Sequence, residues 1–185
     1  MDFEHIQQQA WAWLSQRPSN LYFVFDAARN RSWFRALNRT GSSQPVSLYS
    51  GTAAITLADF APYLLDLKAA TDAQQRIVQQ TWGQSFGIFV QSRANLPATR
   101  LDLKKSLIGT MGERSTYFRF YDPRAWARFI ATADGGQMAQ FFRDSIVGVS
   151  SETGDGHIIT TVEKTRSMLG ILSDFKIEHR KLDQP

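Results

Sequence analysis

The feature that most constrains the fold is the run LYFVF at residues 21–25, in which five apolar and aromatic residues follow one another and Asp26 closes the run. A strand with one face in water alternates apolar and polar residues, whereas a strand covered on both faces is apolar throughout. The length of the run and its β-forming residue types therefore predict a central strand of a sheet that is covered on both faces.

Other segments of the chain alternate between strand-like and helix-like patterns. Further strands are predicted at residues 46–49, 63–67 and 86–90. Apolar residues at helical spacing predict helices at 3–16, 33–37, 72–82, 96–107, 123–130 and 138–142. Strands that alternate with helices favour an α/β fold with a mixed, partly parallel central sheet flanked by helices.

The last forty residues have a different pattern. Residues 145–151 and 157–162 flank the sequence TGDG at 153–156, which is typical of a hairpin turn. Helical spacing of Met168, Leu169, Leu172 and Phe175 then predicts a final helix. We therefore predict an α/β domain over residues 1–143 and a short extension over 144–185, in which a C-terminal β-hairpin and a helix are appended.

Composition excludes several kinds of chemistry. The chain has no cysteine, so it has no disulfide, thiolate metal site or cysteine nucleophile. His5, His157 and His179 are too scattered to form a metal-binding pair, so we predict no metal. The glycines at 109 and 112 lack the Gly-Lys-Ser/Thr ending of a phosphate-binding loop and do not form a dinucleotide fingerprint, so we predict no cofactor.

Charge and hydropathy bear on partners and location. The net charge of +4 comes from 21 basic and 17 acidic residues spread along the chain, whereas a nucleic-acid-binding protein usually concentrates basic residues on one face. No apolar run approaches the ~20 residues of a membrane-spanning helix, and the N-terminus does not resemble a secretory signal. We therefore expect a cytoplasmic protein that binds neither nucleic acid nor membrane.

Residues 117–124 (YFRFYDPR) predict a strand that runs directly into a helix. Asp122 stands at the N-cap position and Pro123 at the first helical position, where its missing N–H costs nothing. Arg119 and Asp26 are further charged residues in or beside apolar strands. Asp26, Arg119 and Asp122 are candidates either for an acid–base pair in a pocket or for a buried ion pair and helix cap. The second interpretation is favoured, because Asp122 has a capping role and Arg119 can reach Asp26 across neighbouring strands.

A competing enzymatic hypothesis rests on residues 83–87 (GQSFG), which have the G-x-S-x-G spacing of a nucleophile elbow around Ser85. That motif functions when a strand precedes the serine and a helix follows it. Here the predicted order is reversed, with a helix before Ser85 and a strand after it. A serine hydrolase that uses Ser85 is therefore the alternative function, and a simple helix-to-strand turn is the favoured interpretation.

Five stretches of the chain, in order, resemble the adaptor/chaperone family of bacterial type VI secretion, long catalogued as a domain of unknown function. They are LYFVFDAA at 21–28, SLYSGT at 47–52, APYLL at 61–65, FGIFVQS at 86–92 and FRFYDPR at 118–124. The resemblance covers roughly residues 20–143. One departure is Asp102, at a position where the family commonly has histidine.

The resemblance implies a non-enzymatic protein. Members of that family hold a cognate secreted effector, help to load it onto the spike protein of the secretion apparatus, and remain in the cytoplasm. We expect Arg119, Asp122 and Arg124 to organise the site, together with Asp26 and Trp126. Arg124 lies just inside the predicted helix, so we expect it to be the most exposed of the three and the best placed for direct contact with a partner.

Overall fold

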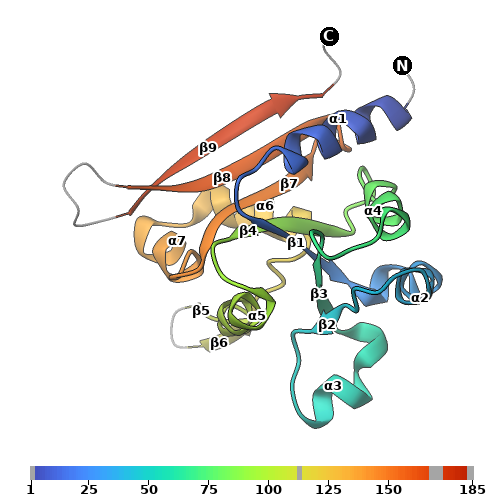
Figure 1. Cartoon of the computed structure of the whole chain (residues 1–185). Helices are drawn as coiled ribbons and strands as arrows, with labels where there is room; N and C mark the ends of the chain where they lie inside the picture. Colours follow the sequence, from blue (N-terminus) through green and yellow to red (C-terminus); the bar gives the residue numbers. More distant parts are fainter. Residues whose placement is uncertain (1–2, 112–113, 167–172, 183–185) are drawn as a thin grey trace.

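The computed structural model describes residues 3–111, 114–166 and 173–182 (Figure 1). Its main sheet has the strand order β2-β3-β1-β4-β7-β8-β9. The strands of this sheet are β1 (Asn20–Asp26), β2 (Val46–Ser47), β3 (Pro62–Asp66), β4 (Gly87–Ser92), β7 (Ile146–Thr153), β8 (Ile158–Arg166) and β9 (Ser173–Lys181). The α-helices are α1 (Phe3–Ser15), α2 (Arg31–Arg39), α3 (Thr52–Thr56), α4 (Asp72–Gln79), α5 (Leu96–Lys105), α6 (Pro123–Thr132) and α7 (Gly135–Phe141). Short 3-10 helices follow β1 at Ala27–Arg29 and precede β3 at Ala58–Phe60.

Strand β1 is central and buried on both faces, as the sequence predicts. Phe23 and Phe25 point into one hydrophobic core, while Tyr22 and Val24 point into another on the opposite face. Since successive side chains of a strand alternate between faces, an all-apolar strand can supply two cores at once.

The two cores make a three-layer molecule, with the sheet between two layers of helices (Figure 1). The first core includes buried residues of α1, α2 and α4. The second includes buried residues of α5, α6 and α7 together with Phe120 and Tyr121 from the segment before α6. None of the helices in the described ranges is both long and apolar enough to cross a bilayer.

The prediction of a partly parallel sheet is wrong, because every pairing in the main sheet is antiparallel. The alternation of strands and helices does give β3 and β4 the same direction. However, β1 lies between them and runs the opposite way, pairing antiparallel with both. The helical connection therefore skips over β1, and no two parallel strands become neighbours.

The C-terminal segment continues the main sheet. The predicted hairpin is confirmed: β7 pairs with β8 and the turn falls between Thr153 and Ile158. β7 also pairs with β4, so the hairpin extends the central sheet directly. The predicted final helix is wrong where the structure describes it, since residues 173–181 form strand β9 on β8. Met168, Leu169 and Leu172 lie outside the described residues.

A second, two-stranded sheet precedes α6. It consists of β5 (Ile108–Met111) and β6 (Arg114–Tyr117), which pair antiparallel. The predicted strand at 117–122 therefore ends at Tyr117. Residues 118–122 instead bend into α6, and the backbone N–H of Asp122 donates to the carbonyl of Arg119 at 3.0 Å. Arg119 lies in this bend and contacts Asp26 at the end of β1.

Candidate functional site

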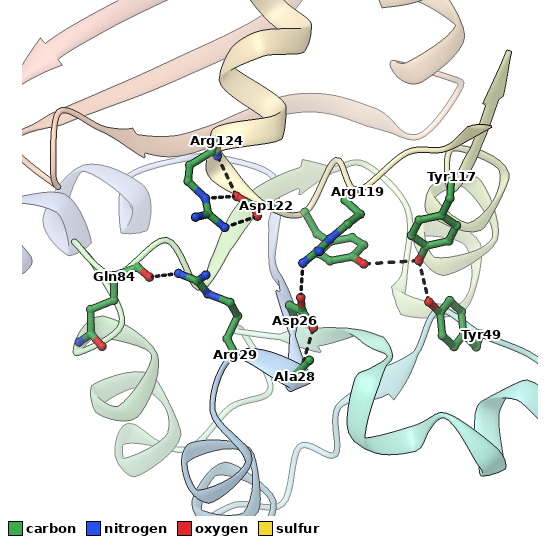
Figure 2. A network of polar contacts seen from close by, with 10 residues as sticks. Asp26, Ala28, Arg29, Tyr49, Gln84, Tyr117, Arg119, Asp122 and Arg124 are labelled. Carbon is green, nitrogen blue, oxygen red and sulfur yellow. Dashed lines mark hydrogen bonds and ion pairs between the residues drawn. The ribbon is translucent and has the colours of Figure 1, made fainter. Parts of the chain in front are cut away.

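The charged residues singled out from the sequence gather at one end of the main sheet, where β1 ends and β4 begins (Figure 2). The backbone N–H of Asp26 donates to the carbonyl of Phe86 there at 3.3 Å. The segment from Tyr117 to Arg124 passes over this end of the sheet. As Figure 2 shows, Arg29 reaches it from the 3-10 helix after β1, whereas Arg119 and Arg124 reach it from the bend before α6 and from the start of α6.

Asp122 caps helix α6, as predicted. Its carboxylate accepts from the backbone N–H of Arg124 at 3.0 Å. It also forms a two-pronged ion pair with the same residue, in which Nε and Nη2 of Arg124 donate at 2.9 and 2.7 Å. Burial raises the pKa of Asp122, but the side-chain and backbone hydrogen bonds from Arg124 and the charges of Arg124 and Arg119 outweigh it, so the pKa lies below its ordinary value.

Asp26 and Arg119 form the predicted ion pair, with Arg119 Nη2 donating to Asp26 Oδ2 at 2.6 Å. Asp26 Oδ1 accepts from the backbone N–H of Ala28 at 2.9 Å and so caps the short 3-10 helix after β1. Arg119 lies in the bend before α6, so the pair joins that bend to the end of β1 and does not cross two neighbouring strands. The Asp26 side chain is buried, whereas the Arg119 side chain is 50% exposed.

A chain of tyrosine hydroxyls fixes the β5–β6 hairpin beside this pair (Figure 2). The hydroxyls of Tyr49 and Tyr117 lie 2.9 Å apart, and those of Tyr117 and Tyr121 lie 3.5 Å apart. Burial raises the pKa of Tyr117, and its hydrogen bonds with Tyr121 and Tyr49 raise it further. The Tyr117 hydroxyl therefore stays protonated at physiological pH, and the three hydroxyls act as hydrogen-bond links between segments.

A buried carboxylate at the end of β7 supports the G-x-S-x-G segment. Glu152 accepts hydrogen bonds from the backbone N–H groups of Gly83 and Ser85. The Ser85 hydroxyl also bonds to Glu152. Burial raises the pKa of Glu152, and these bonds and the charge of Arg29 offset only part of that effect. The carboxylate thus holds the turn in which Ser85 has a positive φ of 53°.

The local order around Ser85 is the reverse of a nucleophile elbow, as predicted. Helix α4 ends at Gln79 before the serine, and strand β4 begins at Gly87 after it. The hydroxyl contacts a carboxylate, which is not the histidine base that a serine triad uses.

Trp126 is fully buried in the core beneath α6. Its ring centroid lies 4.7 Å from that of Phe141 and 5.4 Å from that of Phe129. It therefore organises the packing of α6 against α7, and the surface of the site consists of the neighbouring arginines.

The arrangement suits recognition by charge. In the ranges that the structure describes, no three acidic or histidine side chains come close enough to hold a metal ion. Asp26 and Asp122 are each engaged by an arginine and by a backbone N–H. The exposed parts of the two guanidinium groups remain available for contact with a partner. The Arg119 side chain is 50% exposed and the Arg124 side chain is 58% exposed, so Arg124 is the more exposed of the two, as expected.

Several residues of this region do not stand out in the sequence. Glu152 follows two serines near the end of β7, and no apolar run ending in an acid marks it in the sequence as Asp26 is marked. Arg29 donates to the carbonyl of Gln84 at 2.8 Å, a contact between residues 55 positions apart that no local spacing indicates. The same holds for the contact between Tyr49 and Tyr117.

Comparison with known proteins gives one result. Residues 21–140 match the family described as "Domain of unknown function (DUF4123)". No curated protein and no solved structure matches the chain with significance. The matched range contains the resembling motifs at 21–28 and 118–124, and it includes Asp26, Arg119, Asp122 and Arg124.

Proposed function

The chain belongs to the DUF4123 family, and from this premise we propose that it is a non-enzymatic adaptor of bacterial type VI secretion. In this role it binds a cognate secreted effector in the cytoplasm and helps to load that effector onto the spike protein. The resemblance of five ordered motifs supports the proposal, and the family match covers nearly the same part of the chain, 21–140 against 20–143.

The observation that carries the proposal is the way in which two arginines are held. Arg119 and Arg124 each have a guanidinium group fixed on one side by a buried carboxylate and open to solvent on the other. An arginine that is already oriented loses less conformational freedom on binding, and arginine is enriched among the residues that dominate protein–protein affinity. This surface therefore suits a protein partner that offers carboxylates or carbonyl groups.

The test is co-purification of the chain with a type VI secretion effector and with a fragment of a type VI spike protein. The wild-type protein is expected to form a complex with each partner or with both together. Replacing Arg119 and Arg124 together by alanine is expected to weaken the complex about tenfold or more, measured by titration calorimetry. Arg35→Ala is the matched control, because Arg35 is an exposed arginine on α2, which packs against the other face of the sheet.

Two results would contradict the proposal. One is the absence of any complex with either partner while thermal melting shows that the chain is folded. The other is a complex that the double variant binds as tightly as the wild type, which would remove the arginine surface from the argument.

The serine hydrolase remains the alternative, and a separate measurement addresses it. The observations that favour it are the positive φ of Ser85 and a cavity of about 350 Å³ lined by Ser85, Arg124 and Glu152. The reversed order of helix and strand and the carboxylate partner of Ser85 count against it. Turnover of a nitrophenyl ester that Ser85→Ala abolishes would support a hydrolase, whereas unchanged or absent turnover would exclude this serine as its nucleophile.

A further inference from the structure

A second surface, between the β5–β6 hairpin and helices α6 and α7, forms a groove with a volume of about 290 Å³. We call it the hairpin groove. Its apolar walls include Ile108 and Phe118 from the hairpin side, Phe129 from α6 and Phe141 from α7. Its volume is at the lower end of the range of about 300–1,000 Å³ for small-molecule sites, so it suits one or two side chains.

The hairpin wall of the groove is held in place. Tyr117 lines the groove, and its hydroxyl belongs to the tyrosine chain that ties the hairpin to Tyr49 and Tyr121. Phe118 lines it as well, and its backbone N–H donates to the carbonyl of Leu107 at 2.8 Å. A groove formed before binding costs less to occupy than one that must first be ordered.

Two polar groups of the groove have no hydrogen-bond partner among the described residues. They are the hydroxyl of Ser106, a residue only 8% exposed, and Nε of Arg143, which is itself buried. The N–H at Nε of arginine can only donate, so it requires an acceptor. A buried donor that is left unpaired destabilises the folded protein. Because both atoms are buried, they do not reach a partner in the groove, and it is the guanidinium group of Arg143 as a whole that supplies positive charge there.

The charges of the groove indicate which acceptor fits. Its charged lining residues are Lys105 and Arg143, and none of the described residues that line it is acidic. Asp102 is buried close by, but Lys105 pairs with it at 3.4 Å and the Ser145 hydroxyl donates to it at 2.5 Å. The C-terminal end of α5 adds a partial negative charge, which Lys104 and Lys105 oppose. Among the described residues of the groove, Arg143 therefore has no counter-charge.

We propose that the hairpin groove binds a segment of the partner protein in which a large apolar side chain stands next to an aspartate or glutamate. The apolar side chain packs against Phe118, Phe129 and Phe141, and the carboxylate pairs with the guanidinium group of Arg143. This inference rests on the proposed adaptor function for the identity of the partner, and it adds a second contact surface to that of Arg119 and Arg124.

The test is a titration of the isotope-labelled full chain with the peptide acetyl-Gly-Asp-Phe-Gly-amide, followed by amide chemical shifts. Shifts are expected at Ser106, Ile108 and Arg143, with a dissociation constant in the millimolar range. Peptides with asparagine in place of aspartate, or with alanine in place of phenylalanine, are expected to bind at least about fivefold more weakly. Arg143→Gln is expected to abolish the preference for aspartate, and Arg35→Gln serves as the control.

Three results would overturn this proposal. They are the absence of shifts at the groove, equal binding of the aspartate and asparagine peptides by the wild type, and shifts that grow with protein concentration without peptide. The last would identify a second copy of this chain as the occupant. If an effector binds the wild type and Arg143→Gln equally, the groove proposal fails while the adaptor function stands. If no effector binds, the adaptor function fails and the peptide titration still decides what the groove recognises.

Discussion

Replacement of Asp122 by alanine removes two interactions at the start of α6. The first is the helix cap, in which the carboxylate accepts from the backbone N–H of Arg124. Loss of such a cap costs about 1 kcal/mol, within a range of about 0.5–2 kcal/mol. The second is the ion pair with the Arg124 side chain. Because that side chain is 58% exposed, solvent screening limits the pair to about 0–1 kcal/mol. The expected loss in the free energy of unfolding is therefore about 1–2 kcal/mol.

Two further variants separate these contributions. Asp122→Asn keeps a good capping side chain but loses the charge, so it is expected to cost no more than about 1 kcal/mol. Arg124→Ala keeps the cap and loses only the ion pair, with a similar small cost. The measurement is urea unfolding of all three variants and the wild type, followed by circular dichroism.

The pH dependence provides an independent check. The pKa of Asp122 is lowered in the folded protein, so its contribution is complete above the ordinary pKa of an aspartate and is lost as the pH falls through the lowered value. The difference between the wild type and Asp122→Ala is therefore expected to shrink between about pH 5 and pH 3. Equal destabilisation by Asp122→Asn and Asp122→Ala would refute the reasoning, because the cap would then contribute nothing.

Three other predictions concern stability, all measurable by the same unfolding experiment. Burial raises the pKa of Glu152, so the unfolded chain releases this proton at a lower pH than the folded chain does. The free energy of unfolding of the wild type, relative to that of Glu152→Gln, should therefore fall as the pH rises from about 4 to 7. A difference that stays constant with pH would contradict this. Trp126→Ala should lower the free energy of unfolding by about 3–5 kcal/mol, because the side chain is fully buried. Trp126→Phe should lower it clearly less, because phenylalanine keeps an aromatic ring and the indole N–H that it removes has no partner among the described residues. Equal losses for the two variants would be inconsistent with aromatic packing as the cause. Gly87→Ala places a Cβ 2.2 Å from the Val24 carbonyl oxygen, so it should lower the free energy of unfolding by about 1–3 kcal/mol or more. Gly135→Ala is the control, because a Cβ at that position has open space around it.

The sequence alone determines the features that depend on a few adjacent residues. The all-apolar run of β1 requires cover on both faces, and Asp122 followed by Pro123 begins α6 where predicted. The turn at 153–156 closes the β7–β8 hairpin. The Asp26–Arg119 pair is also foreseeable, since two opposite charges in apolar surroundings favour each other.

Strand β9 shows how two local patterns compete. The apolar residues from 168 to 175 have helical spacing, while Phe175 and Ile177 alternate with charged residues as in a strand. The strand forms in 173–181 because β8 offers a free edge, with backbone groups that β9 pairs along its length. The spacing of residues along the sequence gives no information about such an edge.

The tertiary structure alone decides which segments become neighbours. It places β1 between β3 and β4 and so makes the sheet antiparallel, although the order of elements favours parallel crossovers. It also brings Glu152 to the turn at Gly83 and Ser85, and Tyr49 to Tyr117. These contacts join residues about 70 positions apart. Their formation depends on the packing of both cores against the sheet, because no local energy term specifies them.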